Sequence, residues 1–172
     1  LPLTDSELAS RLSYFLWSTM PDEQLLSLAA AGKLQDEDVL KQQVQRMLRD
    51  PRVRELSENF FVEWMRLREL WSVQPDSRIF KAYYDGPSGK RTLADDMFLE
   101  PMLLFEKILI EDRSILELVH ADYTFVNDEL AKLYGMQPPE EGWNRVPLED
   151  MKRGGVLTSA AMLTLTSYPH RT

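Results

Sequence analysis

Cysteine is absent from this chain of 172 residues. Its absence excludes disulfides, thiolate nucleophiles, Cys-ligated zinc, iron–sulfur clusters and covalent c-type haem attachment. Histidine is scarce as well, because His120 and His170 are the only two. Neither is followed three or four residues later by a second His, Asp or Glu that would complete a helical metal pair. The sequence therefore predicts no metal site and no cofactor within this chain.

Positive charge is also in deficit. The chain has 20 Lys and Arg against 28 Asp and Glu, which gives a formal net charge of −8 and no basic stripe. Such a surface repels a phosphate backbone, so nucleic acid is not an expected partner. No apolar run approaches the roughly 20 residues of a membrane-spanning helix, and residues 1–4 do not begin a secretion signal. We therefore expect no transmembrane segment in this chain.

The common catalytic motifs are missing too. The sequence contains no GxSxG nucleophile elbow, no GxGxxG turn and no phosphate-binding loop. Adjacent acids, such as Asp95 with Asp96, are most often a solvated face rather than an acid–base pair. Gly154 with Gly155 is more typical of a turn than of an anion site. No catalytic residue is predicted, and whether the chain forms part of an enzyme stays open.

What the sequence does contain is helical periodicity along most of its length. Apolar residues recur at spacings of three and four. Most of these runs begin near a capping residue, such as Thr4 with Glu7 three residues later or Asn127, or near a first-turn proline. Pro101 lies inside one such run and predicts either a kink or a helix that starts nearer Glu100. The predicted helices are 5–17, 21–31, 37–49, 51–71, 92–111, 114–119, 127–134 and a last one from about 154.

The longest predicted helix begins at Asp50-Pro51 and runs to Trp71. At 1.5 Å per residue it would extend about 30 Å and form a spine for the shorter helices. The fold class predicted is therefore all-α, an orthogonal bundle of six to eight helices with one long central helix, about 51–71. Any strand is limited to short pieces near Tyr123 or Val146. Residues 1–172 are expected to form a single helical domain, with a possible subdivision at the loop 73–90.

Several segments resemble a known family of protein domains. They are ELASRLSYFLW (7–17), DYTFVN (122–127) with Leu130-Ala131 and Tyr134-Gly135, RGGVLT (153–158) and LTLTSYP (163–169). Together they are similar to planctomycete-type domains of unknown function that occur in long proteins together with cytochrome-c-like domains. The resemblance covers nearly the whole chain, but it brings no established reaction.

The resemblance implies a context. It implies that the chain is a fragment of a larger, exported multidomain protein, located in the periplasm or elsewhere outside the cytoplasm. Its partners would be neighbouring domains of the same polypeptide, among them a cytochrome-c-like domain. The first functional hypothesis is accordingly a helical scaffold or interaction module that positions those domains.

The second hypothesis is that the chain forms part of a carbohydrate-binding or carbohydrate-modifying enzyme site. Arginine and histidine can hold an anionic or hydroxylated ligand, a tyrosine can stack on it, and an aspartate can accept a proton. The residues proposed to converge on one cleft are Asp122, Asn127, Arg153, Tyr168, His170 and Arg171. Each also has an ordinary structural role available, such as a helix cap for Asn127.

Overall fold

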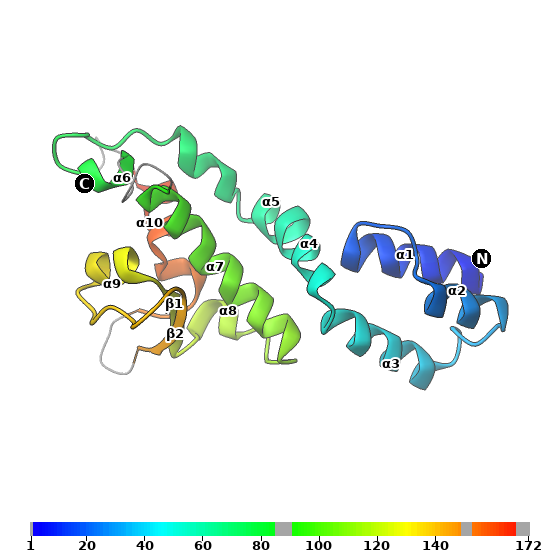
Figure 1. Cartoon of the computed structure of the whole chain (residues 1–172). Helices are drawn as coiled ribbons and strands as arrows, with labels where there is room; N and C mark the ends of the chain where they lie inside the picture. The colour runs from blue at the N-terminus through cyan, green and yellow to red at the C-terminus, as the bar shows by residue number, and fades with distance from the viewer. Residues whose placement is uncertain (1, 85–90, 149–152, 168–172) are drawn as a thin grey trace. The chain divides into compact units, whose positions relative to one another are not determined.

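Helices make up most of the residues that the structure describes, as Figure 1 shows, so the prediction of a largely α-helical fold is confirmed. The structure is a computed structural model that describes residues 2–84, 91–148 and 153–167. The chain divides into two compact units, Leu1–Phe61 and Val62–Thr172. This division falls inside the segment predicted as one long helix and differs from the 73–90 loop considered above.

The first unit is entirely helical in the residues described. Four of its helical segments begin after a side chain that accepts a hydrogen bond from a backbone N–H of the first turn, namely Thr4, Asp22, Asp36 or Asp50. The elements are α1 (Asp5–Trp17), α2 (Glu23–Ala30), α3 (Glu37–Leu48), the 3-10 turn η1 (Pro51–Val53), α4 (Arg54–Leu56) and the π-helical turn η2 (Ser57–Phe61). The capping box predicted from Thr4 and Glu7 is present at the start of α1.

The second unit combines helices with one small sheet. Its elements are α5 (Val62–Trp64), η3 (Leu67–Ser72), α6 (Lys81–Tyr84), α7 (Leu93–Ile110), α8 (Glu117–His120), β1 (Tyr123–Val126), α9 (Asp128–Tyr134), β2 (Asn144–Pro147), η5 (Val156–Thr158) and α10 (Ala160–Thr166). The two strands are antiparallel, with Thr124 opposite Val146. The strand positions near Tyr123 and Val146 are therefore confirmed.

α7 is the helix around which the second unit is built. It contacts η3, α6, α8, α9, β1 and α10. A capping box formed by Thr92 and Asp95 starts it, and Pro101 lies buried within it. Because the helix begins at Leu93, the alternative start near Glu100 is wrong.

The predicted helix from Pro51 to Trp71 is interrupted, which corrects one feature of the expected fold. The segment passes from 3-10 through α to π-helical geometry, and Arg66 then adopts a left-handed conformation with φ of 54°. Aromatic and β-branched residues, here Phe60 to Val62, lower helix propensity. No glycine or proline marks the break, so apolar spacing alone suggested a continuous helix.

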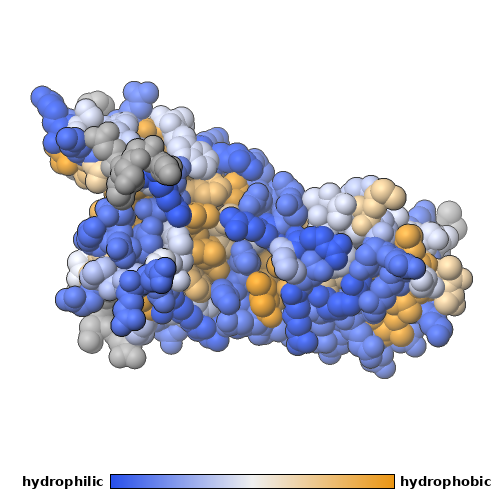
Figure 2. Space-filling model, viewed as in Figure 1, coloured by the Kyte–Doolittle hydropathy of each residue, from blue (hydrophilic) through white to orange (hydrophobic). Residues whose placement is uncertain are grey.

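Large apolar side chains reach the surface of both units. Figure 2 shows hydrophobic residues among a majority of hydrophilic ones on the viewed face. Examples are Phe15 in the first unit and Ile79 in the second, which are 61% and 72% exposed. Within the described ranges, no helix combines the length and apolarity needed to cross a membrane.

Gly155 allows a close approach of backbone segments in the second unit. Its φ is 62° and its ψ is −173°, a combination open essentially to glycine alone. A Cβ at this position would lie 2.4 Å from the backbone oxygen of Leu118 at the start of α8. The turn before η5 therefore packs directly on α8, and only glycine fits between them.

We predict that Gly155→Ala lowers the free energy of unfolding by about 3 kcal/mol, from backbone strain and steric overlap together. Gly142→Ala is the matched control, because Gly142 has φ of 61° and no described atom within 4 Å of its added Cβ. It should cost only about 1 kcal/mol, the strain alone. Urea unfolding of both variants measures the difference. Equal losses would show that the contact with α8 is absent.

Candidate functional site

A buried carboxylate on α7 is the most unusual charged group in the second unit. Glu100 is only 3% exposed, in the middle of the helix. One carboxylate oxygen accepts a hydrogen bond from Thr124 Oγ1 at 2.7 Å, and the other accepts one from the Tyr134 hydroxyl. The same hydroxyl accepts the backbone N–H of Ala160 at 2.8 Å. One carboxylate therefore connects α7 to β1 and α9 directly, and to α10 through Tyr134.

Arg153 supplies positive charge beside this network. Its guanidinium carbon lies 3.9 Å from the centroid of the Tyr134 ring, and its Nη1 donates to the backbone oxygen of Thr158 at 3.0 Å. The backbone N–H of Gly154 donates to Thr158 Oγ1 at 2.8 Å, which fixes the turn that carries Arg153. The arginine is thus held over the aromatic ring by its own turn.

Burial dominates the electrostatics of these groups. It raises the pKa of Glu100 above the ordinary value, and the hydrogen bonds from Tyr134 and Thr124 and the charge of Arg153 oppose the rise only in part. Burial also raises the pKa of Tyr134, and the nearby Glu100 carboxylate adds to that rise. The phenol therefore stays protonated and acts as a hydrogen-bond donor to the carboxylate.

The space beside Glu100 is very small. A cavity of about 10 Å³ is lined by Glu100, Thr124, Tyr134, Leu148, Arg153, Gly155 and Thr158. That volume holds about one water molecule. A sugar ring cannot enter it, so in this conformation Glu100 has no access to a substrate.

A second buried acid lies one turn earlier on the same face of α7. Asp96 is 2% exposed and forms an ion pair with Arg91, whose Nε lies 2.6 Å from Asp96 Oδ1. Burial raises the pKa of Asp96, while a hydrogen bond from Asn127 and the charge of Arg91 oppose the rise. Arg91 in turn lies near the ring of Trp143, at 5.4 Å from its centroid. Both acids therefore contact groups from other segments of the same unit, Glu100 through two hydroxyls and Asp96 through Arg91 and Asn127.

The structure places three of the six predicted site residues. Asp122 is exposed in the turn before β1, where its backbone oxygen accepts the N–H of Leu148. Asn127 caps α9 through a hydrogen bond from the Leu130 N–H, and it also contacts Asp96. Arg153 belongs to the Glu100 network. Tyr168, His170 and Arg171 lie outside the described residues, so their convergence with the others stays a prediction.

Sequence reasoning missed the two acids that organise this region. A signal was present, because Asp96 and Glu100 interrupt the apolar stripe formed by Met97, Leu104 and Ile108. An acid on the buried face of a helix needs a partner, since burying an unpaired charge is costly. Thr124 and Tyr134 come from segments 24 and 34 residues away, and no local spacing identified them.

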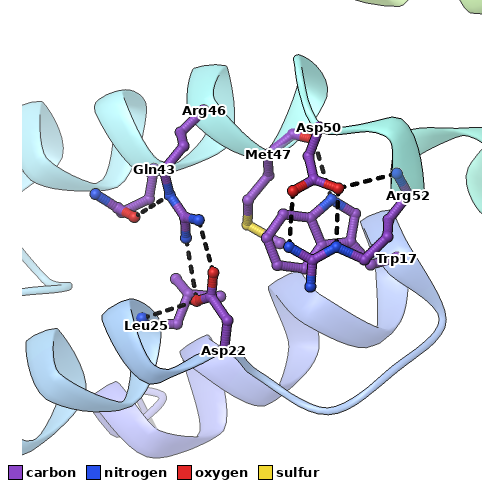
Figure 3. A network of polar contacts seen from close by, with 8 residues as sticks. All are labelled: Trp17, Asp22, Leu25, Gln43, Arg46, Met47, Asp50 and Arg52. Carbon is purple, nitrogen blue, oxygen red and sulfur yellow. Dashed lines mark hydrogen bonds and ion pairs between the residues drawn. The ribbon is translucent and has the colours of Figure 1, made fainter.

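The first unit has its own polar network, centred on the buried ring of Trp17 and drawn in Figure 3. The indole N–H donates to the backbone oxygen of Met47 at 3.0 Å, which ties α1 to α3. The guanidinium of Arg52 lies over the ring, 3.5 Å from its centroid. Asp50 holds that guanidinium with both oxygens, and Arg52 lowers the pKa of Asp50 to about 2.

A second ion pair, between Asp22 and Arg46, joins two helices of the first unit. Asp22 caps α2 and also receives two hydrogen bonds from Arg46, at 2.6 and 3.2 Å. Gln43 accepts a further bond from Arg46 and fixes its orientation, as Figure 3 shows. These contacts join α2 to α3. As in the Glu100 network, both partners of each bond belong to the same unit, and the bonds hold its helices together.

Among residues 2–84, 91–148 and 153–167, no group of three or more His, Asp or Glu side chains is arranged to hold a metal ion. The acids described above instead pair with arginine or with hydroxyl donors. Within the described residues, each network can hold together segments of its own unit.

The raised pKa of Glu100 predicts that the free energy of unfolding depends on pH. A raised pKa means that the folded chain binds this proton more tightly than the unfolded chain does. The stabilisation is therefore complete below the ordinary value of 4.5 and is lost as pH rises through the folded-state pKa. Relative to Glu100→Gln, the wild-type free energy of unfolding should fall as the pH rises above the ordinary value of 4.5. Urea unfolding across a pH series, with Glu141→Gln as an exposed-acid control, measures it. A constant difference would contradict the raised pKa.

The contact between Arg52 and Trp17 can be tested with a charge-conserving change. Arg52→Lys keeps the charge but loses the flat guanidinium that covers the ring and binds Asp50 with two bonds. We expect a loss of about 1 kcal/mol in unfolding free energy. Arg54→Lys, at an exposed pair with Glu58, should stay within about 0.5 kcal/mol of the wild type. Equal effects of the two variants, measured by chemical denaturation, would refute the special role of Arg52.

Comparison with known proteins gives one match. No curated protein and no solved structure matches the chain significantly. Residues 3–136 match the model of a family described as "Protein of unknown function (DUF1592)", PSD4. That range includes both networks up to Tyr134, and it is well over half of the 172 residues. The chain therefore belongs to the DUF1592 family of proteins of unknown function.

Proposed function

We propose that this chain is a helical scaffold or interaction module within an exported, cytochrome-associated multidomain protein. In this role it holds neighbouring domains of the same polypeptide in fixed positions outside the cytoplasm. The sequence resemblance supports the context. The physical support comes from the way in which the charged groups of the second unit are used.

The observation that carries the proposal is the enclosure of Glu100. A general acid or base must reach the atom it protonates or deprotonates. Both oxygens of Glu100 are instead bonded to Thr124 and Tyr134, and the adjoining cavity admits about one water molecule. The strongest candidate for chemistry is thus used to tie segments together. A rigid assembly of short helices is what a scaffold requires.

A patch of exposed aliphatic side chains offers a contact surface for such a role. The α8–η5 patch comprises Ile115, Leu116 and Val119 around α8 and Leu157 on η5, each more than half exposed. The two elements contact each other, and Gly155 packs on the α8 backbone. Neighbouring exposed aliphatic residues of this kind are typical of protein interaction sites. The scaffold proposal expects a neighbouring domain to cover this patch.

The scaffold proposal can be tested by measuring amide hydrogen exchange in the 172-residue chain and in the longer multidomain polypeptide that the proposal assumes. We predict slower exchange over residues 115–119 and 156–158 in the longer polypeptide, because a covering domain excludes water from these amides. Leu116→Asp in the longer polypeptide should restore the faster exchange, whereas Leu133→Asp, at an exposed position on α9, should not. Identical exchange of these residues in both polypeptides would contradict the proposal.

The cytochrome context has a separate test in the complete reading frame. The proposal requires a secretion signal and at least one Cys-x-x-Cys-His haem attachment sequence elsewhere in that frame. A frame that lacks both would refute the exported, cytochrome-associated context. The exchange experiment would still decide whether the chain is an interaction module.

A further inference from the structure

An open cleft in the second unit is lined by aromatic rings and neutral polar groups. It has a volume of about 520 Å³ and lies among the segment after η3, helix α6 and the start of α7. We call it the aromatic cleft and define it by Trp71, Gln74, Ser77, Tyr83, Tyr84 and Thr92. α6 packs against α7 here, as can be followed in Figure 1. Neither network described above contributes a lining residue, so the cleft is a separate feature.

The aromatic rings of the cleft are held in place by their own polar atoms. The indole N–H of Trp71 donates to Asp95 at 2.9 Å, and the centroid of the Trp71 ring lies 4.8 Å from the centroid of the Phe98 ring. The hydroxyl of Tyr84 donates to the backbone oxygen of Pro75 at 2.6 Å. Little conformational entropy is therefore lost when a ligand settles on these rings.

These bonds also decide what the rings can offer to a ligand. Because the Trp71 N–H and the Tyr84 O–H are already donated, neither ring has a donor left for a ligand; what remains is the faces and edges of the rings and the acceptor oxygen of Tyr84. Trp71 is 49% exposed and Tyr84 is 40% exposed. A ligand must therefore present an apolar surface to the rings and find hydrogen-bond donors elsewhere.

Gln74 and Ser77 supply such hydrogen bonds. Both side chains are exposed, and neither has a hydrogen-bond partner within the described part of the chain. The amide of Gln74 both donates and accepts, as does the hydroxyl of Ser77. No charged side chain belongs to the lining that the structure describes. The chemistry of the cleft is thus aromatic and polar, without net charge.

From this arrangement we infer that the aromatic cleft binds a neutral carbohydrate, as a short stretch of a sugar chain. A pyranose ring has an apolar C–H face that stacks on an aromatic face, and its edges carry hydroxyls that need neutral donors and acceptors. Both features are matched by fixed rings beside Gln74 and Ser77. This ligand role goes beyond the scaffold function and uses none of the six residues predicted from the sequence.

A proline-rich peptide is the main competing ligand, because aromatic grooves also bind polyproline helices. Such a peptide presents backbone carbonyls that need hydrogen-bond donors. In this cleft the Trp71 indole N–H already donates to Asp95. The Tyr84 hydroxyl already donates to Pro75. The donors that remain, Gln74 and Ser77, are also acceptors, so they match sugar hydroxyls, which both donate and accept, better than a row of carbonyls, which only accept.

Affinity electrophoresis of the whole 172-residue chain tests the inference. Native gels would contain one of five neutral polysaccharides: hydroxyethyl cellulose, laminarin, galactomannan, arabinoxylan or dextran. We expect at least one of them to retard the chain relative to a gel without polysaccharide. Decaproline binding, followed by tryptophan fluorescence, is measured in parallel.

Four variants locate the binding. Trp71→Ala and Tyr84→Ala should each weaken retardation by about tenfold or more, since each removes an aromatic face. Gln74→Ala leaves both rings in place and should weaken it by a few-fold, about the effect of one hydrogen bond. Tyr14→Ala is the matched control, because Tyr14 is an exposed aromatic residue in the first unit, 56% exposed, and should bind as the wild type does.

Three results would overturn the inference. The first is the absence of retardation in all five gels. The second is retardation that Trp71→Ala, Tyr84→Ala and Gln74→Ala all leave unchanged, which would place binding outside the cleft. The third is decaproline binding that depends on Trp71 and Tyr84 and exceeds the affinity for every polysaccharide. Circular dichroism of each variant confirms that a lost interaction does not reflect a lost fold.

Discussion

The hydrogen bonds of the Glu100 carboxylate are the interaction on which the second unit depends. A carboxylate placed inside a helix bundle is costly unless donors surround it, and here the hydroxyls of Thr124 and Tyr134 do so. Those donors come from β1 and α9, and Tyr134 passes the connection on to the first amide of α10. Because each of these segments is short, none would be stable alone. Their shared connection to Glu100 on α7 holds β1, α9 and α10 together.

In the first unit, short helices are held together by ion pairs that remain partly exposed. Its arginines remain partly exposed, with the guanidinium of Arg52 lying over the ring of Trp17 while Asp50 holds it. Since the flat guanidinium is only weakly hydrated, it can cover an aromatic ring without a large loss of solvation. The two units therefore differ in the burial of their central acids, because Glu100 is enclosed in the second unit whereas the ion pair of Asp50 and Arg52 in the first stays partly exposed. In both, the charged groups contact other parts of the chain.

Local signals predicted the elements well and the contacts between them poorly. Thr4 with Glu7 and Asn127 before α9 gave helix starts that the structure confirms, because a cap acts within one turn. The last helix was expected near residue 154 but begins at Ala160, where Ser159 supplies the cap. Apolar spacing also could not show the break at Arg66, since that residue carries no sequence signal for a left-handed backbone. Glu100 needed partners from distant segments, which periodicity does not identify.

The most direct test of the account is the exchange rate of a single amide. Ala160 is the first residue of α10, where an N–H has no partner within its own helix, and it donates instead to Tyr134. If the Glu100 network holds α10 to α7, the Ala160 amide should exchange as slowly as the central amides of α7. Asp128, the first residue of α9, gives the comparison at an equivalent position. Exchange of Ala160 at the rate of an unstructured peptide would contradict the account.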